Sequence, residues 1–151
     1  MNPSVLLRIA SVFGFLFAVG HTAGAPWTPR KGLPEQTAIE SIKVVESMKS
    51  VHFPVMGNER SYWDFYFGFG VSISVYLFAL AIALWQIASQ AKSQAMQLRP
   101  LMLTFLAAYL INAIVTYRYF FAFPLILAAV MCICIGLAWV SAGRHPATQG
   151  A

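Results

Sequence analysis

The segment from Phe121 to Ala142 reads FAFPLILAAVMCICIGLAWVSA, and it contains no charged residue. About 20 apolar residues are enough to cross a lipid bilayer as a helix. Three other segments are also predominantly apolar, and they span roughly Val5–His21, Phe65–Ser89 and Pro100–Tyr117. The sequence therefore predicts an all-α fold, an integral membrane four-helix bundle that forms a single membrane domain over residues 1–151.

The composition of the chain agrees with this assignment. Of its 151 residues, 59% are hydrophobic and only 10% are charged, whereas a soluble domain carries about 25% charged residues. A net charge of +5 would suggest nucleic-acid binding in a soluble protein, but here the ten Lys and Arg residues are spread over all the connections. We expect them to anchor helix ends against lipid headgroups, and we predict no nucleic-acid partner.

The first apolar segment also has features of a secretory signal peptide, because an Ala-x-Ala sequence that ends at Ala25 follows it. Pro26 would then be the first mature residue, which is a poor choice for a protease that needs an extended peptide there. In addition, Ala10, Gly14 and Ala18 form a stripe of small residues that lets another helix approach closely. We therefore expect this segment to be retained as the first helix.

The long first connection, residues 22–61, is expected to be a proline-rich loop followed by an amphipathic helix over about 35–52. Such a helix either lies on the membrane surface or caps the bundle, and an ordinary packed loop helix is the alternative. Its apolar face comprises Ala38, Ile39, Ile42, Val45, Met48 and His52, and its charged face comprises Glu40, Lys43, Glu46 and Lys49.

Alternating helix directions would bring several polar residues to one membrane face. This face would hold His21, the sequence Arg60 to Asp64, and the sequence Thr116 to Tyr119. Both termini and the second connection, about residues 90–99, would lie on the other face. We expect that face to be cytoplasmic, because it carries positive charge and no acidic residue.

Asp64 is the first candidate for chemistry, because it lies at the edge of the second apolar segment within SYWDFYFGFG, residues 61–70. An ionisable residue at membrane depth usually faces a bundle interior or a polar cavity. The same helical face continues through Gly68 and Ser72. Arg118 is a candidate partner for the carboxylate, and Arg60 competes for it. The structural alternative is that Asp64 caps the helix N-terminus.

His21 is the second candidate, at the end of the first helix. It could exchange protons near neutral pH or ligate a metal or haem, with His52 as a second ligand. Two histidines make only a weak ligand signal, because a metal site needs further ligands. The structural alternative is a histidine that is hydrogen-bonded at a helix C-terminus.

A polar stripe, Tyr109, Asn112 and Thr116, follows one face of the third helix. It predicts either hydrogen bonds between helices or the wall of a cavity for an amphiphile. Together with residues near the predicted polar face, it gives the ligand-binding candidates Arg60, Tyr66, Tyr109, Asn112, Thr116, Tyr117 and Arg118.

Two motifs, Gly20-His21-Thr22-x-Gly24 and the sequence from Ser61 to Gly70, give the chain a family resemblance. It resembles a family of small, uncharacterised bacterial four-helix membrane proteins. The resemblance implies a protein of the bacterial inner membrane and supplies no activity.

The expected function is non-enzymatic: binding of a lipophilic ligand, or a role as an accessory subunit of a membrane complex. One alternative is a membrane-embedded enzyme that acts on a lipophilic substrate with Asp64, His21 and Arg118. Another is a haem or quinone redox protein that uses His21 and His52. The expected partners are membrane lipid and either a lipophilic ligand, further copies of the chain or a larger membrane complex.

Overall fold

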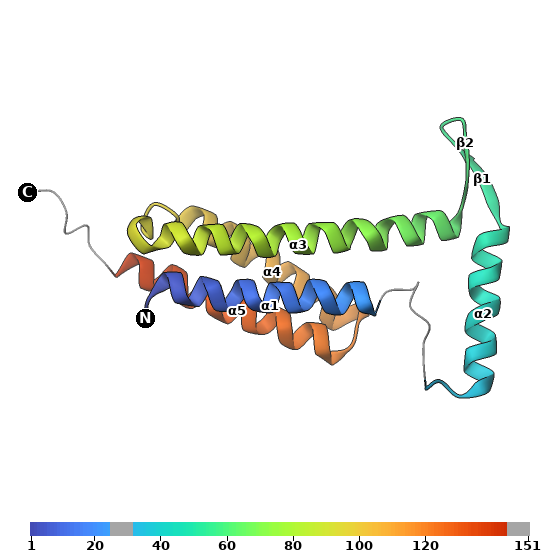
Figure 1. The fold of residues 1–151 in the computed structure, drawn as a ribbon, viewed down its shortest axis with the longest axis horizontal. Coiled ribbons are helices and arrows are strands. Elements are labelled where there is room, and N and C mark those ends of the chain that lie inside the picture. Colours follow the sequence, from blue (N-terminus) through green and yellow to red (C-terminus); the bar gives the residue numbers. More distant parts are fainter. Residues whose placement is uncertain (25–31, 145–151) are drawn as a thin grey trace, which may run out of the picture. The chain divides into compact units, whose positions relative to one another are not determined.

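The computed structural model describes residues 1–24 and 32–144 of the chain. Pro26 and Pro29 of the predicted proline-rich loop therefore lie outside the described residues. Within the described residues, the chain forms five helices and one two-stranded sheet (Figure 1). In order, these are α1 (Pro3–Ala23), α2 (Glu35–Ser50), β1 (His52–Val55), β2 (Asn58–Ser61), α3 (Tyr62–Gln94), α4 (Arg99–Tyr119) and α5 (Ala122–Gly143).

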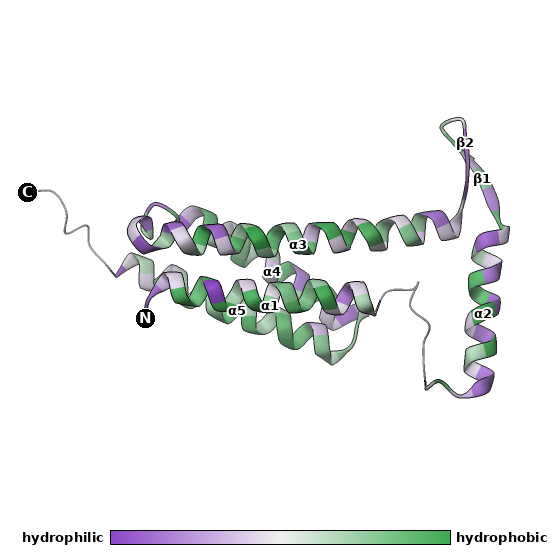
Figure 2. Ribbon diagram, viewed as in Figure 1, coloured by the Kyte–Doolittle hydropathy of each residue, from purple (hydrophilic) through white to green (hydrophobic). Residues whose placement is uncertain are grey.

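Four of the helices, α1, α3, α4 and α5, are long and apolar enough to cross a membrane, as the sequence predicts. Figure 2 shows apolar residues along most of their length, with hydrophilic residues gathered towards the helix ends. Three of them, α1, α3 and α4, are longer than their predicted apolar segments, because helical hydrogen bonding continues into the polar flanks. The longest, α3, has 33 residues, which is about 50 Å of helix against a hydrocarbon layer of about 30 Å.

The chain divides into two compact units, which are described separately here. The core unit comprises Met1–Val19 and Tyr76–Ala151, and the hairpin unit comprises Gly20–Val75.

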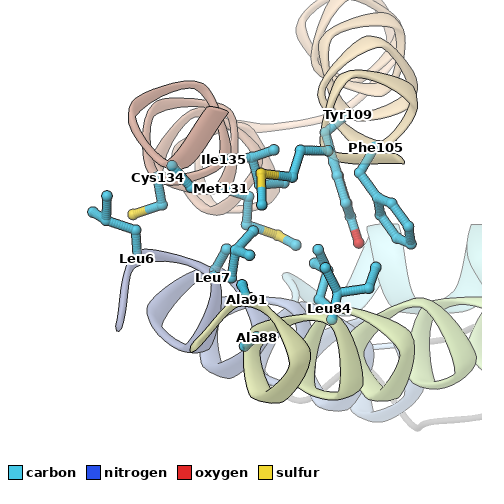
Figure 3. Close-up of a cluster of buried hydrophobic side chains, with 14 of the residues drawn as sticks. Leu6, Leu7, Leu84, Ala88, Ala91, Phe105, Tyr109, Met131, Cys134 and Ile135 are labelled. Atoms are coloured by element: carbon cyan, nitrogen blue, oxygen red, sulfur yellow. The ribbon is translucent and has the colours of Figure 1, made fainter. Parts of the chain in front are cut away.

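One hydrophobic core fills the core unit, and α1, α3, α4 and α5 all contribute side chains to it (Figure 3). Leu7, Leu84, Met102, Met131 and Ile135 are its largest fully buried apolar side chains. Between membrane helices, such packing stabilises mainly through van der Waals contact, because lipid tails are as apolar as leucine.

The predicted stripe of small residues on α1 is a packing face. Ala10 and Ala18 are completely buried. At Gly14, an added Cβ would lie 3.1 Å from Met131 Cε and 3.2 Å from Ala81 Cβ. The absence of a side chain at Gly14 therefore allows α1 to approach α3 and α5 closely.

A second small-residue stripe in α5, Ala128, Cys132 and Gly136, is only partly a packing face. Ala128 is completely buried, but an added Cβ at Gly136 would find its nearest neighbour 3.9 Å away. The buried side of α5 continues through Ile135 and Ala138 instead.

Two buried serines join α1 to α3. Ser11 Oγ donates to the carbonyl oxygen of Ala81 at 2.7 Å, and Ser4 Oγ donates to that of Ala88 at 2.6 Å. The two bonds are seven residues apart on each helix. From Ser4 to Ser11 the residue number rises along α1, while the partner's number falls from Ala88 to Ala81 along α3. They therefore show that α1 and α3 are antiparallel in the core unit.

In the hairpin unit, the sequence analysis did not predict the β1–β2 hairpin. The strands pair antiparallel from His52 with Ser61 to Val55 with Asn58. The turn between them consists of Met56 and Gly57, with φ values of 48° and 82°. Two successive residues with positive φ give the tight turn that suits the twist of a hairpin.

The predicted amphipathic helix forms as α2, but it ends at Ser50 because β1 begins at His52. None of its residues is buried. Val45 and Met48 are half-buried, whereas Ile39 is 41% and Ile42 is 57% exposed. The described chain therefore covers only part of the predicted apolar face.

Candidate functional site

Asp64 forms a reciprocal cap at the start of α3. Its Oδ2 accepts hydrogen bonds from the backbone N–H of Ser61 at 2.7 Å and from Ser61 Oγ at 3.0 Å. In return, the backbone N–H of Asp64 donates to Ser61 Oγ at 3.2 Å. This is the capping-box arrangement, and a carboxylate there also interacts favourably with the helix dipole. The structure thus shows the capping role that the sequence offered as an alternative.

Asp64 also lines an open groove with a volume of about 450 Å³ in the hairpin unit. The groove runs from the tip of the hairpin along the first turns of α3. The predicted helical face of Asp64, Gly68 and Ser72 forms one side of it. The remaining lining residues come from the hairpin and from α3, and they are Val55, Met56, Asn58, Arg60, Phe65 and Phe69.

Charged and aromatic side chains lie next to each other in this groove. Asn58, Arg60 and Asp64 lie at the hairpin end, where the Arg60 side chain donates to the carbonyl oxygen of Glu59 at 2.8 Å. Phe65 and Phe69 follow along α3 and leave apolar surface beside the charged groups. Charged groups beside aromatic side chains suit a ligand with a polar head and an apolar body.

Aromatic contacts hold the hairpin against α3. The ring of Phe53 in β1 lies 4.9 Å from that of Tyr62 and 5.8 Å from that of Phe65, measured between ring centroids. Tyr66, a predicted ligand-binding residue, is 45% exposed with its ring 6.0 Å from that of Trp63, and it does not line the groove.

His21 belongs to a separate polar network that joins the end of α1 to α3. Its Nε2 lies 3.2 Å from the carbonyl oxygen of Gly70, to which Ser74 Oγ also donates at 3.2 Å. Thr22 Oγ1 donates to Ser74 Oγ at 3.0 Å. With the proton on Nε2, His21 donates to a backbone carbonyl, which is the structural alternative that the sequence offered.

Asp64 and His21 are not brought to one cavity in the described part of the chain. His21 bonds at Gly70, six residues along α3 from Asp64, which corresponds to about 9 Å of helix. His21 is also not among the residues that line the groove.

His52, the second predicted haem ligand, is exposed in β1, with Nδ1 3.1 Å from the carbonyl oxygen of Ser50. Among residues 1–24 and 32–144, no three His, Cys, Asp or Glu side chains lie together as a metal site would require.

The predicted polar stripe of α4 divides between two environments. Tyr109 and Thr116 are buried in the core unit, at 4% and 3% exposure, whereas Asn112 is exposed. Thr116 Oγ1 donates to Asn112 Oδ1 at 3.4 Å. The three residues of the stripe are therefore divided between the buried and the exposed side of α4.

Tyr117 and Arg118 at the end of α4 are exposed, and the Arg118 guanidinium lies 5.6 Å from the centroid of the Tyr119 ring. Since Arg118 belongs to the core unit and Asp64 to the hairpin unit, their pairing stays a prediction.

Sequence reasoning missed a stacked arginine in the core unit. The Arg99 guanidinium carbon lies 4.4 Å from the centroid of the Trp139 ring, and an added Cβ at Gly143 would lie 3.0 Å from it. Arg99 and Trp139 are on consecutive helices, so only the register of α4 against α5 brings them together.

A scan of family models, a search of curated proteins and a search of solved structures each found no match for this chain.

Proposed function

We propose that this chain is a non-enzymatic, four-helix integral membrane protein that binds an amphiphilic, lipophilic molecule in the groove of the hairpin unit. The observation that carries the proposal is the composition of the groove, which has Arg60 and Asp64 at one end and Phe65 and Phe69 beyond them. A polar headgroup would lie against the two charged side chains, and the apolar body would follow α3.

The side of the groove formed by Asp64, Gly68 and Ser72 leaves room for a bulky occupant. Gly68 has no atom within 4 Å of the position that its Cβ would take. Asp64, Gly68 and Ser72 are successive residues on one side of α3, so the open path extends over about 12 Å of helix. An alkyl or prenyl chain could therefore lie along the helix without displacing a side chain.

Binding is favoured over catalysis because both candidate catalytic groups have structural partners. Asp64 bonds to Ser61 at the helix start, and His21 bonds to the carbonyl of Gly70. A general base must lie within hydrogen-bond reach of the proton that it abstracts, directly or through one water. The distance along α3 between these two groups argues against a shared substrate.

The proposal includes a bacterial inner membrane with both termini on the cytoplasmic side. Arg99, at the start of α4, packs against Gly143, at the end of α5. The second connection and the C-terminal end of α5 therefore share one end of the core unit, with Lys92, Arg99 and Arg144 nearby in sequence. A positively charged end without acidic residues is typical of the cytoplasmic side.

Native mass spectrometry of the full chain, purified in a mild detergent, tests the binding proposal. We expect a bound species of a few hundred daltons on the wild-type protein. Gly68→Phe would fill the groove at a position with free space, and it should abolish this species. Val71→Phe is a matched control, because Val71 is 39% exposed on the same helix and does not line the groove. A ligand-free wild-type mass, or equal retention by both variants, would overturn the proposal.

A further inference from the structure

We propose that the core unit binds an anionic phospholipid, whose phosphate lies against Arg8 and whose acyl chain follows a groove between α1 and α3. Every residue of this site belongs to the core unit. The inference therefore goes beyond the binding function proposed for the hairpin unit and does not rest on it.

An open groove of about 200 Å³ lies between α1 and α3. It is lined by Phe15 from α1 and by Ile82 and Trp85 from α3. Both helices are long and apolar enough to cross a membrane, and Ile82 is 47% and Trp85 43% exposed. Because the lining is aromatic and aliphatic, part of an acyl chain is a suitable occupant in a bilayer.

A half-buried arginine lies beside this groove. The Arg8 guanidinium carbon is 5.0 Å from the centroid of the Trp85 ring, and Trp85 is one of the lining residues. Within the described part of the chain, the buried Nε of Arg8 has no hydrogen-bond partner. Arg8 is the sixth residue of α1, about 8 Å from the start of the helix. A cation at that depth is costly unless a negatively charged group lies near it.

The core unit supplies no carboxylate side chain for Arg8. All five acidic residues of the chain lie from Glu35 to Asp64, in the hairpin unit. The core unit has five Lys or Arg residues, and these are Arg8, Lys92, Arg99, Arg118 and Arg144. A phosphate diester from the surrounding lipid would supply the charge that the core unit lacks.

Arg99, the other arginine stacked on a tryptophan, differs from Arg8 in this respect. Its guanidinium lies against Gly143 at the C-terminal end of α5, where the partial negative charge of the helix dipole offsets a cation. Arg8 lies near the start of α1, where the dipole has the opposite sign. Of the two stacked arginines, Arg8 therefore has the greater need of an external anion.

The Arg8 end of the site is far along both helices from the hairpin unit. Arg8 precedes Val19, the last core-unit residue of α1, by eleven residues, and Trp85 follows Tyr76, the first core-unit residue of α3, by nine. These separations correspond to about 16 Å and about 14 Å of helix. The pairing of Arg8 with Trp85 is therefore a property of the core unit itself.

Positive charge continues from the groove towards the end of α3. Lys92 is exposed and follows Trp85 by seven residues, so it lies about two turns further along the same side of the helix. The order of apolar groove, Arg8 and Lys92 matches the order of acyl chain, phosphate and headgroup surface in a lipid leaflet. Basic pockets between membrane helices bind anionic headgroups in this way.

An anionic headgroup fits this site better than a zwitterionic one. The ammonium group of a zwitterionic lipid would meet Arg8 and Lys92 with like charge, and the core unit has no acidic side chain to bind it. A headgroup with a net negative charge avoids this repulsion. The site is therefore expected to select phosphatidylglycerol over phosphatidylcholine.

Lipid titration of the full chain in a mild detergent, followed by native mass spectrometry, tests this selection. With matched acyl chains, we expect phosphatidylglycerol to bind about tenfold more tightly than phosphatidylcholine, as one additional charge-assisted bond would give. Arg8→Gln should remove this preference, and Arg8→Lys should retain most of it. Arg144→Gln takes the same charge from an exposed position outside the groove, and it should keep the preference.

A second pair of variants tests the groove with Arg8 intact. Ile82→Trp should weaken binding of both lipids severalfold because it fills the groove. Ile133→Trp is the matched control, since Ile133 is 61% exposed on α5 and does not line the groove. Gly68→Phe, which blocks the groove of the hairpin unit, should leave phosphatidylglycerol binding unchanged. The two proposals can therefore fail separately.

Three results would overturn the lipid site. The first is equal affinity of the wild-type chain for the two lipids. The second is a preference for phosphatidylglycerol that Arg8→Gln keeps, or that Arg144→Gln loses to the same extent. The third is displacement of the lipid by an equal concentration of inorganic phosphate, which would indicate a site for the free anion.

Discussion

Ser61 and Asp64 exchange three hydrogen bonds across the first turn of α3, with donor–acceptor distances of 2.7, 3.0 and 3.2 Å. The acidic residue that the sequence marks as a candidate for chemistry therefore fixes the point at which the hairpin ends and the helix begins. Because the same carboxylate lines the groove, the cap also positions one wall of the proposed ligand site.

Ser61→Ala should destabilise the hairpin unit. Ser61 is 4% exposed, and the substitution removes the capping hydroxyl, which is worth about 1 kcal/mol in typical helices. Amide hydrogen exchange would show faster exchange in the first turn of α3. Ser89→Ala is the control, since its hydroxyl bonds only to the carbonyl of Trp85 within the same helix. Unchanged protection of the first turn in Ser61→Ala would contradict the capping role.

Gly14→Ala should lower the free energy of unfolding by about 1–3 kcal/mol, the usual cost of overpacking a core. The new methyl group would lie 3.2 Å from Ala81 Cβ, and neither of those two groups can rotate away. Gly68→Ala should instead be neutral or stabilising by up to about 1 kcal/mol, because its Cβ meets free space in a helix. Thermal unfolding in detergent distinguishes the two variants. Equal midpoints would refute the close approach of α1 to α3.

Arg99 and Trp139 should be energetically coupled. A double-mutant cycle with Arg99→Met and Trp139→Leu is expected to give an interaction energy of about 1 kcal/mol, as for a partly desolvated cation–π pair. Arg118 and Tyr119 provide the comparison, since both side chains are exposed with the guanidinium 5.6 Å from the ring. That pair should couple far more weakly. A coupling energy near zero for Arg99 and Trp139 would rule out stacking in solution.

Ser11→Ala should cost about 0.6 kcal/mol, the average for a hydrogen bond between membrane helices. Ser11 is completely buried and bonds to Ala81 in α3. Ser4→Ala removes the equivalent bond to Ala88, so the two substitutions should have similar and additive effects on the unfolding midpoint. If neither variant shifts the midpoint, these serines contribute nothing measurable to the pairing of α1 with α3.

Local patterns in the sequence were sufficient to predict where the helices form. Long, predominantly apolar segments predicted the four long helices, and an apolar face opposite a charged face predicted α2. Both signals are complete within one segment of the chain. The hairpin was missed because its turn uses a non-glycine residue, Met56, at positive φ. Asp64 lies at the start of an apolar run, where the helix dipole favours an acid, so the capping role could be offered beforehand.

The sequence by itself determined that this chain is mainly helical, with four helices able to cross a membrane. The length and the hydropathy of each apolar segment can be read from that segment alone, without its neighbours in space. Only the tertiary structure decided which side of each helix is buried. An apolar helix such as α5 has no periodic polar signal, so its packing face through Ile135 and Ala138, rather than Gly136, depends on its neighbours. The same holds for α4, where contact with the other helices buries Tyr109 and Thr116 and leaves Asn112 exposed.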